Sequence, residues 1–205
     1  MMEFVRQYGL EAAGTLASLI YLFYSIREKS WLWPWGIIAS VVSLIVFYQS
    51  ALYADMGLQV YYVVISAYGW WYWLSGQSVE DNVDVPIKLL NKRLLLKSLL
   101  VGITLYFALL LALLRIPAMV DIASSDLPYL DAFTTAASIV ATWMLARKYI
   151  HHWLFWIVIN SVSMGMYLYK GLFFYSFLFL VYTVGAIIGY LEWKRFMNMR
   201  SNEVQ

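Results

Sequence analysis

Aromatic and amide side chains recur at helical spacing between residues 153 and 167. Intervals of three or four residues separate Trp153, Trp156, Asn160, Ser163 and Tyr167, so these side chains share one face of a helix. Indole rings suit flat heteroaromatic ligands and attract cationic ones, and an amide both donates and accepts hydrogen bonds. This face predicts a slot for a planar ring, which a positive charge would suit, attached to a hydroxylated group.

A second polar face of the same kind runs from residue 59 to residue 73. It carries Gln59, Tyr62, Ser66 and Trp70, and the segment 132–145 adds Thr135. Inside a membrane a polar side chain must meet a partner, a cavity or a ligand, and an unpartnered amide costs about 1–3 kcal/mol. We therefore expect the substrate-binding residues to be Trp153, Trp156, Asn160, Gln59, Tyr62, Ser66, Trp70, Thr135, Ser163 and Tyr167.

Plainer interpretations exist for several of these aromatic and polar residues. Trp153 could be an anchor at the membrane–water interface, and Trp156 and Asn160 could simply pack against a neighbouring helix. His151 and His152 are interpreted as an exposed helix start. Interface anchors are expected at Trp31, Trp33, Trp35, Trp71 and Trp193.

Composition restricts the class of protein. Of the 205 residues, 63% are hydrophobic and 13% charged, with a mean hydropathy of +0.69, whereas soluble domains are about 45–50% apolar and about 25% charged. This excludes a soluble enzyme, a disordered chain and a nucleic-acid-binding module. The chain has no cysteine, and its pattern contains no catalytic constellation, metal site or cofactor site. No carboxylate lies in the middle of an apolar segment, so coupling to an ion gradient is not indicated.

The elements that must position these residues are membrane-spanning helices, each of which needs about 20 apolar residues. The sequence predicts an all-α membrane protein with seven of them. The fifth predicted span is unusually polar for a membrane helix, because it is rich in hydroxyl groups. The predicted spans are 10–26, 31–53, 56–74, 98–114, 132–145, 153–169 and 172–191.

Basic residues predict how the chain crosses the membrane. Eleven of the 14 Lys and Arg residues fall on one side of the seven spans, and the positive-inside rule places that side in the cytoplasm. We expect a multi-pass membrane protein with its N-terminus outside and its C-terminus in the cytoplasm.

The chain also matches itself at an offset of 120 residues. Residues 11–73 align without a gap to residues 131–193 with 15 identities, which include Arg27 with Arg147 and Trp33 with Trp153. This predicts a parallel 3+1+3 repeat, an arrangement found in transporters that bind substrate between their halves. The expected parts are a first three-helix bundle (1–74), a loop, linker helix and outer loop (75–130), a second bundle (131–193) and a cytoplasmic tail (194–205).

Residues 153–160 read Trp-Leu-Phe-Trp-Ile-Val-Ile-Asn, a WxxWxxxN pattern. With this pattern the chain resembles the Pnu family of bacterial vitamin transporters, from residue 11 to residue 193. The further matching segments are Asp131-Ala132, Ser138-Ile139-Val140-Ala141, Arg147-Lys148-Tyr149, Leu52-Tyr53-Ala54, Leu58-Gln59-Val60 and Tyr68-Gly69-Trp70.

The resemblance implies a protein of the bacterial inner membrane that takes up a vitamin precursor by facilitated diffusion, with a cytosolic kinase trapping the product by phosphorylation. Nicotinamide riboside is the favoured substrate and thiamine the alternative. Trp153, Trp156, Asn160 and Gln59 are the implied site. This chain has His151-His152 where relatives often carry an acidic residue. A second alternative is a membrane receptor or scaffold that does not transport, and association into a homo-oligomer stays open.

Overall fold

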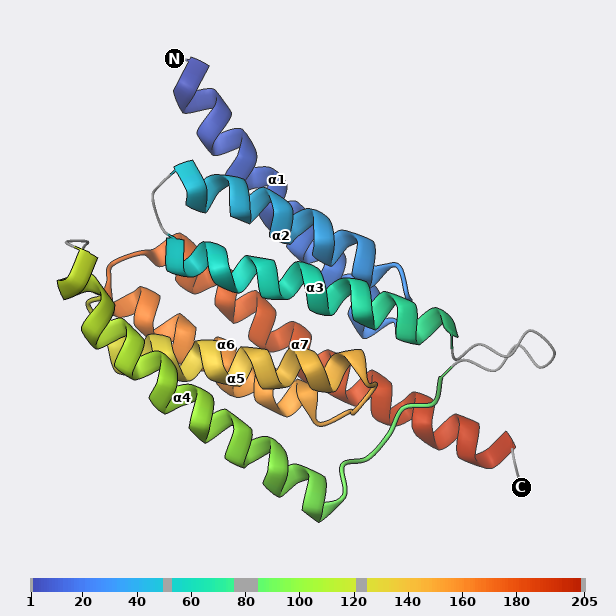
Figure 1. Ribbon diagram of the computed structural model, residues 1–205. Coiled ribbons are helices and arrows are strands. Elements are labelled where there is room, and N and C mark those ends of the chain that lie inside the picture. Colours follow the sequence, from blue (N-terminus) through green and yellow to red (C-terminus); the bar gives the residue numbers. More distant parts are fainter. Residues whose placement is uncertain (1, 50–52, 76–84, 121–124, 204–205) are drawn as a thin grey trace. The chain divides into compact units, whose positions relative to one another are not determined.

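The part of the chain that the computed structural model describes forms seven helices (Figure 1). The structure describes residues 2–49, 53–75, 85–120 and 125–203. Within these ranges the helices are α1 Met2–Ile26, α2 Leu32–Gln49, α3 Tyr53–Ser75, α4 Lys92–Val120, α5 Pro128–Ala146, α6 His152–Tyr169 and α7 Phe173–Glu203.

The predicted number of helices is confirmed, and each predicted span overlaps one of them. Residues 50–52 of the predicted span 31–53 lie outside the described residues, and Tyr53 already begins α3. The hydroxyl-rich fifth span is helical from Pro128 to Ala146. Two of its hydroxyl groups bond back to the helix: Thr142 Oγ1 donates to the carbonyl of Ser138 at 2.8 Å, and Thr134 Oγ1 donates to that of Leu130 at 3.0 Å. Such local bonds satisfy a hydroxyl without any partner outside the helix, which is why polar residues are tolerated here.

Left-handed backbone conformations end three of the helices. The turn between α6 and α7 contains Gly171 at φ 71°, and the N–H groups of Gly171 and Leu172 bond back to carbonyls in the last turn of α6. This is the usual glycine stop of a helix. Glu28 after α1 and Lys148 after α5 adopt φ 56° and 57° without being glycine, which is uncommon and indicates turns held by their surroundings.

The chain divides into two compact units. Unit 1 comprises residues 1–87, 146–148 and 192–205, and unit 2 comprises residues 88–145 and 149–191. In unit 1, α2 packs against both α1 and α3 (Figure 1). In unit 2, Gly102 of α4 faces Val140 of α5. Each unit is described by itself below.

A tryptophan seated on a glycine fixes a helix contact in each unit. In unit 1 the Trp33 ring of α2 covers Gly69 of α3, and in unit 2 the Trp153 ring of α6 covers Gly189 of α7. A side chain on either glycine would overlap the indole ring, so the ring can pack here only because the residue is glycine. The second contact repeats the first at an offset of 120 residues, the offset of the sequence self-match.

The interface-anchor prediction was wrong for two tryptophans. Trp33 and Trp193 are completely buried, whereas Trp31 and Trp71 are 63% and 64% exposed, as an anchor requires. Position near a helix end does not distinguish the two groups. The difference is whether a small residue or a carbonyl on a neighbouring helix accepts the ring, and the hydropathy of the helix itself does not reveal this.

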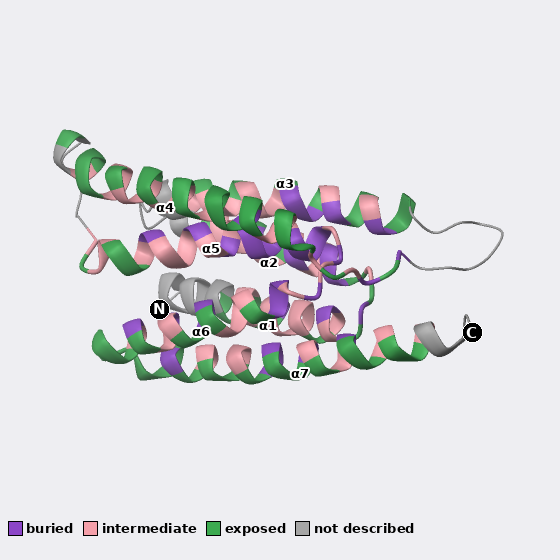
Figure 2. Ribbon diagram, turned by 90° about the horizontal axis from the view of Figure 1, so that it is seen from below, coloured by how far each residue is buried: buried purple, intermediate pink, exposed green. Residues whose placement is uncertain are grey.

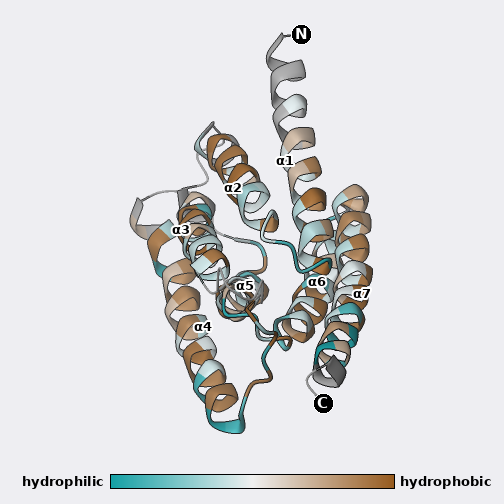
Figure 3. Ribbon diagram, turned by 90° about the vertical axis from the view of Figure 1, so that its right-hand side faces the viewer, coloured by the Kyte–Doolittle hydropathy of each residue, from teal (hydrophilic) through white to brown (hydrophobic). Residues whose placement is uncertain are grey.

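Helix α4 presents apolar side chains on its exposed surface. Among its described residues Ser98 alone is buried, while Leu100, Ile103 and Phe107 are more than half exposed (Figure 2). Figure 3 shows the same helix as predominantly hydrophobic. An exposed apolar face of this extent indicates contact with lipid.

Length and composition alone identify two helices as able to cross a bilayer, Lys92–Pro117 and Phe173–Arg200. Ala12–Ile26 and Leu32–Ile45 are shorter apolar helices.

Candidate functional site

Helix α6 buries the face that carries the predicted site residues. Trp153, Asn160 and Ser163 are 2%, 5% and 7% exposed, and Trp156 and Tyr167 are half-buried. Leu154, Val158, Ser161 and Leu168 lie on the opposite face and are exposed. The helical spacing of the aromatic and amide residues therefore does place them on one inward face of unit 2.

Asn160 and Ser163 are buried polar side chains without a hydrogen-bonding partner on this face. Neither side chain makes a hydrogen bond with any residue that the structure describes. Their polar atoms are not among the completely enclosed unbonded atoms, which include Trp33 Nε1. Buried side-chain amides are nearly always bonded, and each exception calls for an explanation. The surface-facing Ser161, by contrast, donates to the carbonyl of Ile157 at 2.7 Å. The unpartnered groups are thus the inward ones, which is the arrangement expected of groups kept for a ligand.

The aromatic residues of the α6 face differ in how closely their rings pack against other residues of the protein. Trp153 covers Gly189, and its ring lies 4.4 Å from the ring of His152. Tyr167 stacks on Tyr175 of α7, with centroids 5.4 Å apart. Trp156, one helical turn before Asn160, is half-buried, and no ring contact of its own is found among the described residues. Trp156 is therefore the indole best placed to receive a ligand ring.

Helix α3 carries the second predicted set, in unit 1. Ser66 is 4% exposed, and Gln59 and Tyr62 are half-buried. Gln59 and Ser66, like the α6 pair, form no side-chain hydrogen bond with the described residues. Trp70, which the spacing put on the same face, is 38% exposed. It lies at the edge of this face.

Tyr21 of α1 is a residue that the sequence analysis missed. Gly36 of α2 lies between the Tyr21 ring and the Ser66 hydroxyl, so that a side chain at Gly36 would come within 3.1 Å of the ring and 3.3 Å of the oxygen. Tyr21 follows Ser18 by three residues on α1, which is the signal that could have found it. The three helices of unit 1 thus bring a phenol and a hydroxyl together.

Thr135 of α5, the remaining predicted site residue, is half-buried in unit 2. It makes no side-chain hydrogen bond with the described residues. Its neighbour Thr134 donates to the carbonyls of Leu130 and Asp131, so Thr135 is the hydroxyl of this turn that remains available.

A buried charge network in unit 1 was not predicted. Lys148 Nζ lies 2.8 Å from Glu28 Oε1, and both side chains are under 5% exposed. Arg200 approaches the same oxygen at 3.0 Å, and Lys148 lies 4.3 Å from the centre of the Trp73 ring. Glu28 and Lys148 are 120 residues apart, so the self-match aligns an acidic residue with a basic one at this position. That pairing of charges is the sequence signal from which the ion pair could have been predicted.

Tryptophan N–H groups surround this network with hydrogen bonds. Trp73 Nε1 donates to the carbonyl of Ala146 at 3.2 Å, and Trp193 Nε1 donates to that of Ser25 at 2.9 Å. The two indole rings lie 6.2 Å apart. These bonds hold carbonyls near the ends of α1 and α5, which explains how both turns keep their left-handed residues.

The histidine pair is only partly an exposed helix start. His152 is completely buried, contrary to the prediction, because its ring packs against Trp153. His151 accepts a hydrogen bond at Nδ1 from the N–H of Leu90, at 3.3 Å. Partial burial lowers the pKa of His151. A neutral imidazole at this position matches its role as an acceptor, because a protonated ring has no acceptor.

Metal binding finds no support in the parts of the chain that are described. Among these residues no three His, Cys, Asp or Glu side chains gather closely enough to hold an ion.

Comparison with known proteins gives consistent matches along the chain. The profile of a family described as "Nicotinamide mononucleotide transporter" matches residues 8–195. The "Nicotinamide riboside transporter PnuC" of Escherichia coli (strain K12) is 28% identical over 202 residues, covering 90% of this chain and 84% of the relative. The "Riboflavin/roseoflavin transporter RibM" of Streptomyces davaonensis is 26% identical over 186 residues, covering 89% and 83%.

A solved structure has the same fold. The "Crystal structure of the Vitamin B3 transporter PnuC" matches with a TM-score of 0.70 at 20% identity, covering 96% of this chain and 85% of that one.

Proposed function

Because the chain belongs to the nicotinamide mononucleotide transporter family, we propose that it carries a vitamin precursor across the bacterial cell membrane, with nicotinamide riboside as its substrate. The naming of the Escherichia coli relative supports this substrate. So does the chemistry of the α6 face, which offers an indole beside an amide. Nicotinamide riboside joins a flat cationic ring to a sugar with several hydroxyl groups.

Asn160 is the observation that carries the proposal. It is 5% exposed, yet its amide has no hydrogen-bonding partner among the described residues. An unmade hydrogen bond costs about 1–3 kcal/mol, and a polar side chain inside a membrane protein is by default a functional group. We assign the amide to a polar group of the substrate.

Trp156 supplies a surface for the ring. A cation over an indole face gains about 0.5–2 kcal/mol, depending on how far water is excluded. Trp153 is committed to Gly189, so we assign it to holding α6 in place behind the site. Ser163, Tyr167 and Thr135 complete the proposed set in unit 2.

In unit 1, taken by itself, the α3 set is proposed as a second face that can hydrogen-bond the hydroxyl groups of a substrate. Gln59 and Ser66 keep unsatisfied donors and acceptors, and Tyr62 and Trp70 flank them along the same helix. Ribose hydroxyls need groups that both donate and accept hydrogen bonds, which amides and hydroxyls do.

We propose that transport is by facilitated diffusion. A uniporter only equilibrates its substrate, so net uptake requires that the free concentration inside stay low. Phosphorylation by a cytosolic kinase would achieve this, because none of the proposed substrate-binding residues carries a positive charge that would bind a phosphate. The chain itself is proposed to lie with its C-terminus in the cytoplasm, following the distribution of Lys and Arg.

The test is a liposome assay with purified protein. Radiolabelled nicotinamide riboside, thiamine or riboflavin is supplied outside vesicles that contain the same compound unlabelled, with no proton or sodium gradient. We expect rapid exchange of nicotinamide riboside, and no acceleration when a gradient is imposed. Empty liposomes are the control.

Each other outcome identifies a different function. Exchange of thiamine alone would select the alternative substrate. Binding by calorimetry without any exchange would indicate a receptor or scaffold. Acceleration by a gradient would contradict uniport.

A further inference from the structure

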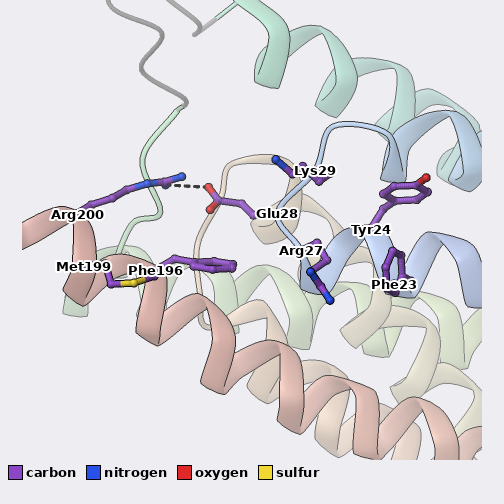
Figure 4. A pocket seen from close by; sticks show the side chains of 8 residues that line it. All are labelled: Phe23, Tyr24, Arg27, Glu28, Lys29, Phe196, Met199 and Arg200. Atoms are coloured by element: carbon purple, nitrogen blue, oxygen red, sulfur yellow. Dashed lines mark hydrogen bonds and ion pairs between the residues drawn. The ribbon is translucent and has the colours of Figure 1, made fainter.

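A groove of about 540 Å³ lies at the end of α1, beside the last turns of α7 in unit 1 (Figure 4). Its apolar lining consists of Phe23 on α1 and of Phe196 and Met199 on α7. Ligand pockets commonly enclose about 300–1,000 Å³, so the groove is large enough for a headgroup and the carbons next to it. None of the proposed substrate-binding residues lines it.

Positive charge dominates the groove. Arg27, Lys29 and Arg200 line it, and the carboxylate among them, Glu28, is already engaged by Arg200 and by the buried Lys148. Figure 4 shows the Arg200–Glu28 pair. Arg27 and Lys29 are exposed, and neither forms an ion pair with a residue that the structure describes. Two cations are therefore available to an anion from outside.

The groove lies where the exposed residues of α1 and α7 change from apolar to basic, as they do at a membrane–water interface. On α1 the exposed face changes from Leu16 and Phe23 to Arg27, whose guanidinium lies 5.4 Å from the centre of the Phe23 ring. On α7 exposed apolar residues give way to Lys194 and Arg195, and Figure 3 shows this end as hydrophilic. Basic side chains at such a boundary extend from apolar surroundings toward water.

We propose that this groove binds the headgroup of an anionic phospholipid, with its phosphate at Arg27 and Lys29 and its first apolar carbons against Phe23 and Phe196. Basic pockets at the ends of membrane helices bind acidic lipid headgroups in this way. A soluble phosphate shares the charge, but it has no apolar part to cover the 53%-exposed Phe23. This inference does not depend on the transported substrate.

The test is a lipid titration followed by native mass spectrometry. Delipidated protein in detergent receives dioleoylphosphatidylglycerol or dioleoylphosphatidylcholine, and the bound fraction is measured for each. The double variant Arg27→Gln/Lys29→Gln is compared with Lys92→Gln/Arg93→Gln, which removes the same charge from exposed positions on α4. The charge-preserving double variant Arg27→Lys/Lys29→Arg checks that charge is what matters.

We expect the wild-type chain to prefer phosphatidylglycerol, and Arg27→Gln/Lys29→Gln to weaken that binding by about 30-fold. The α4 variant and the charge-preserving variant should bind as the wild type does. Equal binding of both lipids, or equal losses in the two neutralised variants, would overturn the proposal. So would competition by inorganic phosphate or glycerophosphoglycerol at the same concentration as the lipid, since the site would then take a soluble phosphate.

Discussion

At the scale of single residues, the environment of a side chain separates groups kept for a ligand from groups used in folding. Serine and threonine hydroxyls on exposed surfaces bond back to their own helix, as Ser161 does. Asn160 and Ser163 on the buried face of the same helix do not. Leaving polar groups unpaired costs folding free energy, so their persistence inside the protein favours a binding role.

Replacing Asn160 by alanine should weaken binding of nicotinamide riboside by about 5- to 150-fold, the effect of losing one hydrogen bond in a buried site. Calorimetry on purified protein measures it. Ser161→Ala, one residue away on the exposed face, is the matched control and should leave the affinity unchanged. Equal affinities for the two variants would remove Asn160 from the site.

His151 should make stability depend on pH. Its pKa is lowered in the folded protein because the ring is partly buried, so the unfolded chain takes up a proton first, near pH 6.5. Stability is therefore complete above that pH and is lost as the pH falls. Thermal unfolding between pH 7.5 and 5.5 (chosen to bracket that value) should show a steeper decline for wild type than for His151→Gln. His152 is present in both chains, so parallel curves would contradict the assignment to His151.

At the scale of helices, glycines and turns decide which surfaces meet. Trp33 can reach α3 only because Gly69 has no side chain. The turns after α1 and α5 hold Glu28 and Lys148 in left-handed conformations, and the ion pair between them, with the surrounding indole N–H bonds, stabilises those conformations.

Gly69→Ala should destabilise the protein by about 1–3 kcal/mol, because the new methyl group overlaps the Trp33 ring. Gly57→Ala on the same helix meets nothing within 4 Å. It should be neutral or stabilising by up to about 1 kcal/mol, the helix propensity difference. Unfolding midpoints in detergent compare the two. A Gly69→Ala protein as stable as Gly57→Ala would show that the ring can move aside.

Glu28→Gln should cost about 3–5 kcal/mol, since it leaves the ammonium of Lys148 buried without its counter-charge. The double variant Glu28→Gln/Lys148→Met removes both buried charges and should recover much of that loss. Arg200 is 40% exposed, so water can solvate it in either variant. With the single variant Lys148→Met and the wild type, these chains form a double-mutant cycle that thermal unfolding can measure, and strict additivity would show that the pair does not interact.

At the scale of the whole molecule, the membrane determines the pattern of charge and apolar surface. Exposed leucine, isoleucine and phenylalanine along α4 require lipid around them. We predict from the sequence that 11 of the 14 basic residues lie on the cytoplasmic side of the membrane. Arg27 and Lys29, which line the proposed lipid groove, belong to those eleven.

The predicted orientation in the membrane can be tested by introducing single cysteine residues, because the chain has no cysteine of its own. Lys170→Cys places a thiol just before α7 begins and Lys194→Cys places one 21 residues into that helix, and both positions are exposed. A membrane-impermeant maleimide added to intact spheroplasts should label Lys170→Cys and spare Lys194→Cys until the membrane is opened. The reverse pattern would overturn the predicted orientation.

The sequence by itself determined the helices and the family. Apolar runs of sufficient length, broken by charged or glycine turns, placed all seven helices, and helical spacing found the buried face of α6. These are local properties, in which each residue is compared only with its neighbours along the chain. The WxxWxxxN pattern is local in the same sense.

The tertiary structure alone decided which side chains are used up in packing. The sequence predicted Trp33 and Trp193 as interface anchors, but both are buried, and it did not predict the buried ion pair between Glu28 and Lys148. Each of these outcomes depends on a partner on another segment, such as a glycine, a carbonyl or a counter-charge. The free energy of burial belongs to that pair of surfaces, so it cannot be assigned from either segment alone.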